Sequence, residues 1–74
     1  MKTQKGVSIP DDFAQVLANH SQLLAVLERM RPSCQQEYVD WIMQSKEQDI
    51  RTRRINSVLA KITDWGERHQ LLSV

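Results

Sequence analysis

Apolar residues recur every three or four positions along most of this 74-residue chain, and that spacing predicts amphipathic helices. A first helix is expected to begin after Ser8-Ile9-Pro10 and to end near Ala18, because proline and the two following aspartates suit a helix's first turn. Ser21 is expected to cap a second helix, which stops before Pro32 because the residue preceding a proline avoids helical geometry. The apolar stripe of this second helix is Leu23, Leu24, Leu27 and Met30.

Two further helices are predicted in the second half of the chain. Ser33 followed by Gln36 has the spacing of a capping box, which predicts a third helix from Cys34 to about Ser45. Its predicted inward face is Cys34, Tyr38, Trp41, Ile42 and Ser45. A fourth helix, capped by Asp49 and closed by Gly66, is expected to bury Ile55, Val58, Leu59 and Ile62.

The predicted fold is therefore all-α, a small bundle of four short amphipathic helices in a single domain. A chain this short cannot divide its core and still offset the entropy cost of folding. Residues 1–7 offer no obvious group to bury and are expected to form a flexible N-terminal tail. The helical domain is expected to span residues 8–66, followed by a partly frayed extension over residues 67–74.

Three arginines lie in the first turns of the fourth helix, and they point in different directions. Because successive helical residues rotate by about 100°, Arg51 lies roughly in line with the aliphatic stripe that starts at Ile55. By the same geometry Arg54 borders that stripe, about 60° away, and Arg53 lies on the opposite side, facing water. The three side chains therefore do not form one basic stripe.

Four residues near the link between the third and fourth helices are candidates for contact with a partner or an anion: Trp41, Lys46, Arg51 and Arg54. Arg51 has two interpretations, because a guanidinium near a core must be paired. It either pairs within the chain, with a carboxylate or with carbonyls that end the third helix, or it joins Lys46 and Arg54 in binding. For Trp41 and Tyr38, core packing is weighed against a role as a partner's anchor.

Composition and charge narrow the function classes. A net charge of +1 provides no strong field toward nucleic acid or anionic lipid. The longest apolar run, residues 23–27, is far too short to cross a bilayer, and the single cysteine, Cys34, suits a reducing cytoplasm. His20 and His69 lack a third ligand at metal spacing, and no nucleophile has a base placed beside it by the sequence. We expect no membrane insertion, no cofactor, no metal and no enzymatic activity.

Part of the chain resembles a known family. The relevant strings are Glu37-Tyr38-Val39-Asp40-Trp41-Ile42, then Ser45-Lys46, then Arg51-Thr52-Arg53-Arg54-Ile55. With the Pro10-Asp11 start, they resemble the YdeI-like, OmpD-associated helical domain, a bacterial family also described under bacteriocin protection. The similarity extends over residues 9 to about 62, with Ser45, Asp49 and Ile50 in place of the family's usual alanine, glutamate and threonine. The resemblance implies a link to envelope stress or bacteriocin protection and names no reaction.

Two functional hypotheses follow from these residues. The first is a protein-interaction module that uses the four candidate residues to bind an unknown protein partner. A homodimer is also possible under this hypothesis. The second is a helix-turn-helix nucleic-acid binder with the fourth helix as reader. The near-neutral charge, the acidic Glu47 and Asp49, and the spread of the arginines around the helix all favour the first hypothesis.

Overall fold

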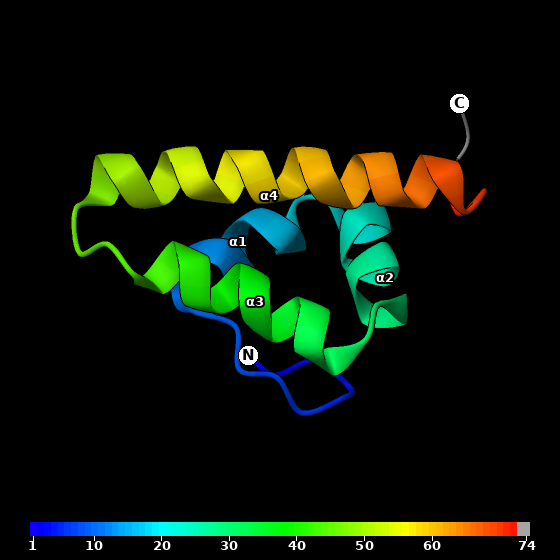
Figure 1. Cartoon of the computed structure of the whole chain (residues 1–74), viewed down its shortest axis with the longest axis horizontal. Coiled ribbons are helices and arrows are strands. Elements are labelled where there is room, and N and C mark those ends of the chain that lie inside the picture. Colours follow the sequence, from blue (N-terminus) through cyan, green and yellow to red (C-terminus); the bar gives the residue numbers. More distant parts are fainter. Residues whose placement is uncertain (73–74) are drawn as a thin grey trace.

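The computed structural model describes residues 1–72, and its architecture within them is helical. The four helices are α1 (Asp11–Ala18), α2 (Ser21–Arg29), α3 (Pro32–Met43) and α4 (Gln48–Arg68). Figure 1 shows α4 running the length of the molecule along one side, with the three shorter helices beneath it. The predicted all-α bundle in a single globular unit is confirmed.

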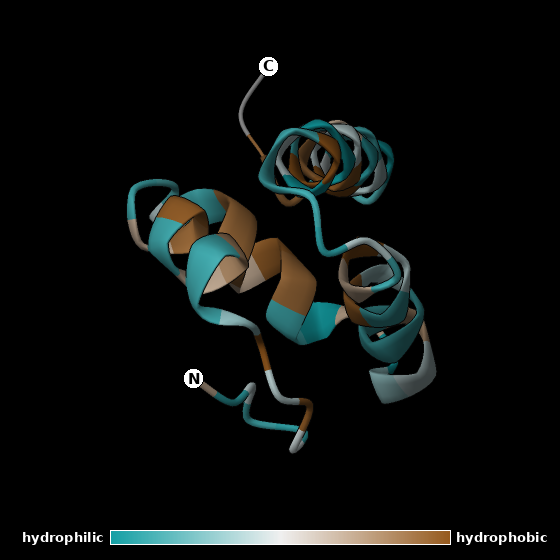
Figure 2. Ribbon diagram, turned by 90° about the vertical axis from the view of Figure 1, so that its left-hand side faces the viewer, coloured by the Kyte–Doolittle hydropathy of each residue, from teal (hydrophilic) through white to brown (hydrophobic). Residues whose placement is uncertain are grey.

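One shared core holds the four helices together. α4 packs against α2 and α3, and α1 packs against α2. In Figure 2, where α4 is seen nearly end-on, hydrophobic residues gather between the helices and hydrophilic residues on the outer side. The most deeply buried apolar side chains are Phe13, Leu17, Leu27, Ile42, Val58 and Ile62. None of the helices in residues 1–72 is both long and apolar enough to cross a membrane.

The N-terminal segment packs on this core, so the prediction that residues 1–7 bury nothing is wrong. Val7 is only 5% exposed and Thr3 only 4%. An isolated antiparallel bridge joins Lys2 to Ser8, and the chain turns between them at Gly6, whose φ of 89° suits glycine. The segment is therefore a short hairpin-like arm of the helical unit.

A fully buried glutamine fastens this arm to the helices. The Thr3 hydroxyl donates to Gln35 Oε1 at 2.8 Å, and Gln35 Nε2 donates to the carbonyl oxygens of Leu27 and Met30 at 2.7 and 3.1 Å. The Lys5 ammonium also donates to the Met30 carbonyl, at 2.6 Å. Carbonyls at the end of α2 have no helical partner, so these contacts satisfy groups that burial would otherwise penalise.

The inward face of α3 differs from the predicted one. Ile42 is buried as expected, but the other buried residues of the helix are Gln35 and Val39. Cys34, Tyr38 and Trp41 are half-buried and pack against the edge of the core. The helix is thus rotated by about one residue from the prediction, which placed the aromatic side chains innermost.

Several predicted helix starts are also wrong. Helix α3 begins at Pro32, so Ser33 lies inside its first turn, and the Gln36 amide donates to Asp40 instead of forming a capping box. Proline at the first helical position lacks the amide that a cap would satisfy. The residues just before α2 and α4 are His20 and Glu47, so Ser21 and Asp49 are helical residues and not caps.

The end of α4 is closed by Gln70, so the prediction that Gly66 closes it is wrong. Gln70 has a φ of 56°, its amide donates to the Glu67 carbonyl at 3.1 Å, and the Leu71 amide donates to Gly66 at 2.8 Å. This pair of bonds is a Schellman motif. Gly66 is buried within the helix, where a Cβ atom would lie 2.9 Å from Leu72 Cδ1. A larger residue at position 66 would force the Leu72 or Val26 side chain to shift, so close packing favours glycine there. Of the predicted extension over residues 67–74, residues 73–74 lie outside the described chain.

Candidate functional site

The guanidinium of Arg51 forms a two-pronged ion pair with Asp12. Nε donates to Asp12 Oδ2 at 2.8 Å, and a terminal nitrogen donates to Oδ1 at 2.9 Å. The two side chains are 17% and 23% exposed, so water screens the pair only in part. A third, longer contact of 3.4 Å reaches the Ser45 carbonyl just beyond α3. Of the two interpretations of Arg51, the structure realises pairing within the chain.

The ion pair connects the first turns of two helices that are far apart in sequence. Asp12 lies in the first turn of α1, where its Oδ1 also accepts the Phe13 amide at 3.0 Å. The hydrogen bonds from Arg51 hold the pKa of Asp12 below its ordinary value, although partial burial opposes them. The same contact raises the pKa of Arg51. A first-turn position alone therefore does not explain Asp12, because its carboxylate fixes α4 to α1.

Arg54 attaches α4 to the end of α3. One terminal nitrogen donates to the Trp41 carbonyl at 2.6 Å, and the guanidinium carbon lies 5.2 Å from the centre of the Trp41 ring. That carbonyl belongs to the last turn of α3, where carbonyl oxygens lack helical partners. The Lys61 ammonium lies 5.0 Å from the same ring centre. Trp41, Arg54 and Lys61 therefore form a cation–π cluster, which we call the Trp41 cluster.

Lys46 is the one candidate residue that makes no hydrogen bond or ion pair with any residue from 1 to 72. It is exposed on the link between α3 and α4, at an open hollow of about 510 Å³. The lining residues of this hollow are Asp11, Asp12, Lys46, Gln48 and Arg51. The structure thus brings Lys46 and Arg51 together at one hollow and places Arg54 and Trp41 in the Trp41 cluster.

Two members of this region were not among the predicted site residues. The Lys61 ammonium lies against the Trp41 ring even though the residue is exposed. Asp12 was expected only to suit the first turn of its helix, whereas it is the partner of Arg51. The positions of Arg54 and Lys61, seven residues apart, were the available signal for Lys61, because such residues share a helix face.

A second hollow, of about 390 Å³, lies where the link between α2 and α3 meets the last turns of α4. It is lined by Arg29, Met30, Arg31, Cys34, Trp65 and His69. The rings of Trp65 and His69 stack with their centres 3.8 Å apart, and His69 Nδ1 donates to the Trp65 carbonyl at 2.8 Å. His69 and His20 are exposed.

Cys34 and His69 line the same hollow, but each of them already interacts with another group of the chain. Cys34 interacts with Tyr38, whose pKa is raised to about 12, first by burial and then by this thiol. His69 is held by the Trp65 carbonyl. In the part of the chain that the structure describes, no three histidine, cysteine or acidic side chains gather as a metal site would require.

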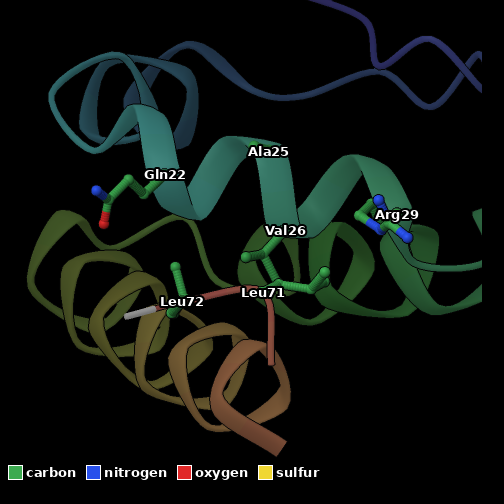
Figure 3. Close-up of a pocket in the computed structure, with 6 residues that line it drawn as sticks. All are labelled: Gln22, Ala25, Val26, Arg29, Leu71 and Leu72. Carbon is green, nitrogen blue, oxygen red and sulfur yellow. The ribbon is translucent and has the colours of Figure 1, made fainter. Parts of the chain in front are cut away.

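A third depression, of about 290 Å³, separates α2 from the segment that follows α4. Figure 3 shows Gln22 and Arg29 near its two ends, with Leu71 and Leu72 lying across from Val26. Its floor is apolar, and it is formed in part by the packing of Leu72 against Gly66.

The fold and these clusters define a small helical-bundle domain with a cation–π cluster at its surface. The chain belongs to the family described as bacteriocin-protection, YdeI or OmpD-associated, whose family model matches residues 7–64. This confirms the resemblance inferred from the strings between Glu37 and Ile55. Searches of curated proteins and of solved structures each gave no match.

Proposed function

We propose that this chain is a non-enzymatic protein-interaction domain whose contact surface is the region of Trp41, Lys46, Arg51 and Arg54. The observation that carries the proposal is the Trp41 cluster, in which a half-buried indole is held beside two cations at the surface. Tryptophan and arginine are the residues that most often anchor protein interfaces. Side chains that are already fixed also lose less conformational entropy when a partner binds.

The four residues have different parts in this proposal. Arg51 and Arg54 are bound within the chain, so they set the geometry of the surface. The exposed Lys46 supplies a free positive charge, and the edge of Trp41 supplies apolar contact area. The family description supports a role in bacteriocin protection or an association with OmpD, which we propose is exerted from the cytoplasm.

The internal pairing of the arginines also argues against the helix-turn-helix alternative. A reader helix needs first-turn side chains that are free to contact base edges. Arg51 is bound to Asp12, and Arg54 is bound to the Trp41 carbonyl. Of the first three arginines of α4, only Arg53 is exposed, and it lies beside the acidic end of the helix that carries Asp49.

The test compares Lys46→Glu with the matched variant Arg53→Glu. Both positions are exposed, so neither charge reversal should disturb the fold, which circular dichroism checks. Tagged chains are used to capture proteins from a bacterial lysate, followed by quantitative mass spectrometry. We expect at least one protein to be captured by the wild type and by Arg53→Glu and to fall about tenfold or more with Lys46→Glu.

Two results would overturn this proposal. The first is a set of captured proteins that is the same for both variants. The second is binding of the purified wild type to duplex DNA at physiological ionic strength with a steep dependence on salt, because that dependence reports phosphate contacts.

A further inference from the structure

The hollow between the α2–α3 link and the end of α4 combines an apolar floor with a basic rim. Met30, in the floor, is 1% exposed, and Trp65 and Cys34 beside it are half-buried. The exposed rim residues are Arg29, Arg31 and His69. Figure 1 shows α2, the start of α3 and the last turns of α4 at the same end of the molecule, away from the link that carries Lys46.

The guanidinium groups of the two rim arginines have no partner among residues 1–72. Arg51 and Arg54 of α4 are each bound through their side chains by oxygens of the chain, but the side chain of neither Arg29 nor Arg31 makes a hydrogen bond or an ion pair within those residues. The residues that line the hollow include no acidic side chain. A nearby acid, Glu28, has both carboxylate oxygens on the Gln4 amide, at 3.0 and 3.2 Å.

The chemistry of the hollow specifies a ligand with two parts. Two unpaired guanidinium groups suit a carboxylate, because each can donate two parallel hydrogen bonds to it. The half-buried Trp65 suits an apolar group next to that carboxylate. A free inorganic anion would use only the rim. An acidic peptide segment carries both parts on one chain and can enter an open hollow from the side.

We propose that this hollow binds an acidic peptide segment of a partner protein. A carboxylate of the segment lies between Arg29 and Arg31, and an apolar side chain next to it packs on Trp65. The inference rests on the proposed function in one respect, that the partner is a protein. The hollow itself is a separate site from the surface around Lys46.

The test is an NMR titration of the ¹⁵N-labelled chain with a blocked five-residue peptide that has one aspartate between two leucines. The readouts are the indole N–H of Trp65 and the Nε–H groups of Arg29 and Arg31. The matched peptide has asparagine in place of aspartate. We expect saturable shifts at these groups with the acidic peptide and about tenfold weaker binding of the asparagine peptide.

Variants locate the effect. The double variant Arg29→Gln, Arg31→Gln should lose the response, whereas Arg53→Gln, which removes an exposed arginine elsewhere, should retain it. Sodium phosphate is the third probe. Absence of a response at Trp65, equal responses to the two peptides, or a response to phosphate as strong as that to the acidic peptide would each overturn the proposal.

The two proposals fail separately. Lys46→Glu leaves the hollow unchanged, so it should bind the acidic peptide as the wild type does. If Lys46→Glu loses captured proteins and the wild type gives no response to the peptide, only the proposal of a peptide site in the hollow is refuted. If the peptide binds and capture does not depend on Lys46, only the proposal of a contact surface around Lys46 is refuted.

Discussion

Asp12 serves two structural purposes with one carboxylate. It accepts the amide of Phe13 at the start of α1 and the guanidinium of Arg51 at the start of α4. The lowered pKa of Asp12 means that the folded state prefers the charged form more strongly than the unfolded chain does. This contribution to stability is present above the ordinary value of 3.8 and is lost as the pH falls through the lower folded-state pKa.

Replacing Asp12 with asparagine should therefore lower the free energy of unfolding at pH 7 by about 1 to 2 kcal/mol. The loss follows from leaving a partly buried guanidinium without its counter-charge. The difference from wild type should shrink as the pH drops below about 4, because the carboxyl of the unfolded wild-type chain is protonated first and that of the folded chain follows at lower pH. Urea denaturation followed by circular dichroism at several pH values measures both effects.

Asp11→Asn is the control for this prediction, because Asp11 is exposed in the same helical turn and forms no ion pair within residues 1–72. Asp11→Asn should lower the free energy of unfolding at pH 7 by less than half as much as Asp12→Asn does. Equal losses for the two variants, or a loss for Asp12→Asn that does not change with pH, would show that the Arg51 contact contributes little.

The local pattern around Arg51 predicted a guanidinium at the entrance to the core that must be paired. It could not identify Asp12 as the partner, because the two residues are 39 positions apart and no periodicity connects them. Burial of Gln35 was likewise beyond prediction. Its partners are the Thr3 hydroxyl and two carbonyls of the neighbouring helix end, which come together only after the chain has folded.

At the scale of the elements, periodicity was informative where aliphatic residues dominate. Ile55, Val58 and Ile62 on α4 are buried as predicted, whereas Leu59, predicted with them, is only half-buried at the edge of the core. On α3 the prediction placed the large aromatic residues Tyr38 and Trp41 on the inward face, and this made the predicted face wrong. Both carry polar groups and long rings that reach the core from its edge, so Val39 takes the innermost position.

Helix ends were predicted less well because their partners lie elsewhere in the chain. Glycine is the residue type that most often closes a helix. The contact that favours it at position 66, however, comes from Leu72, after the chain has turned back beyond the end of α4. The left-handed position is occupied by Gln70, and glutamine carries no local signal for that role.

Gly66→Ala tests this explanation of the end of α4. Helix propensity alone would favour alanine by about 1 kcal/mol. A Cβ atom at this position, however, would lie 2.9 Å from Leu72 Cδ1 and 3.0 Å from Val26 Cγ2. We expect Gly66→Ala to lower the free energy of unfolding, and to be less harmful when Leu72 is also replaced by alanine. A double-mutant cycle by urea denaturation measures that coupling.

Ser57→Ala provides the comparison for helix propensity, because Ser57 is exposed within the same helix. It should be neutral or slightly stabilising. Zero coupling between positions 66 and 72, with Gly66→Ala as favourable as Ser57→Ala, would contradict the role of close packing.

For the whole molecule, α4 connects the other helices through contacts of different kinds. Its aliphatic stripe packs on the core, Arg51 reaches α1, and Arg54 reaches the end of α3. Arg51 and Arg54 therefore maintain the fold and shape the proposed surface. Arg29 and Arg31, at the opposite end of α3, are left free to bind an external anion. The possible homodimer stays a prediction.

This division between structural and available arginines is the central claim, and NMR of the arginine Nε–H groups in the free protein tests it most directly. The Nε–H of Arg51 donates to Asp12, so its exchange with water should be about tenfold or more slower than that of Arg29, Arg31 and Arg53. Asp12→Asn should remove most of that protection. Equal exchange at all four arginines, or protection of Arg29 and Arg31 in the free chain, would contradict the account.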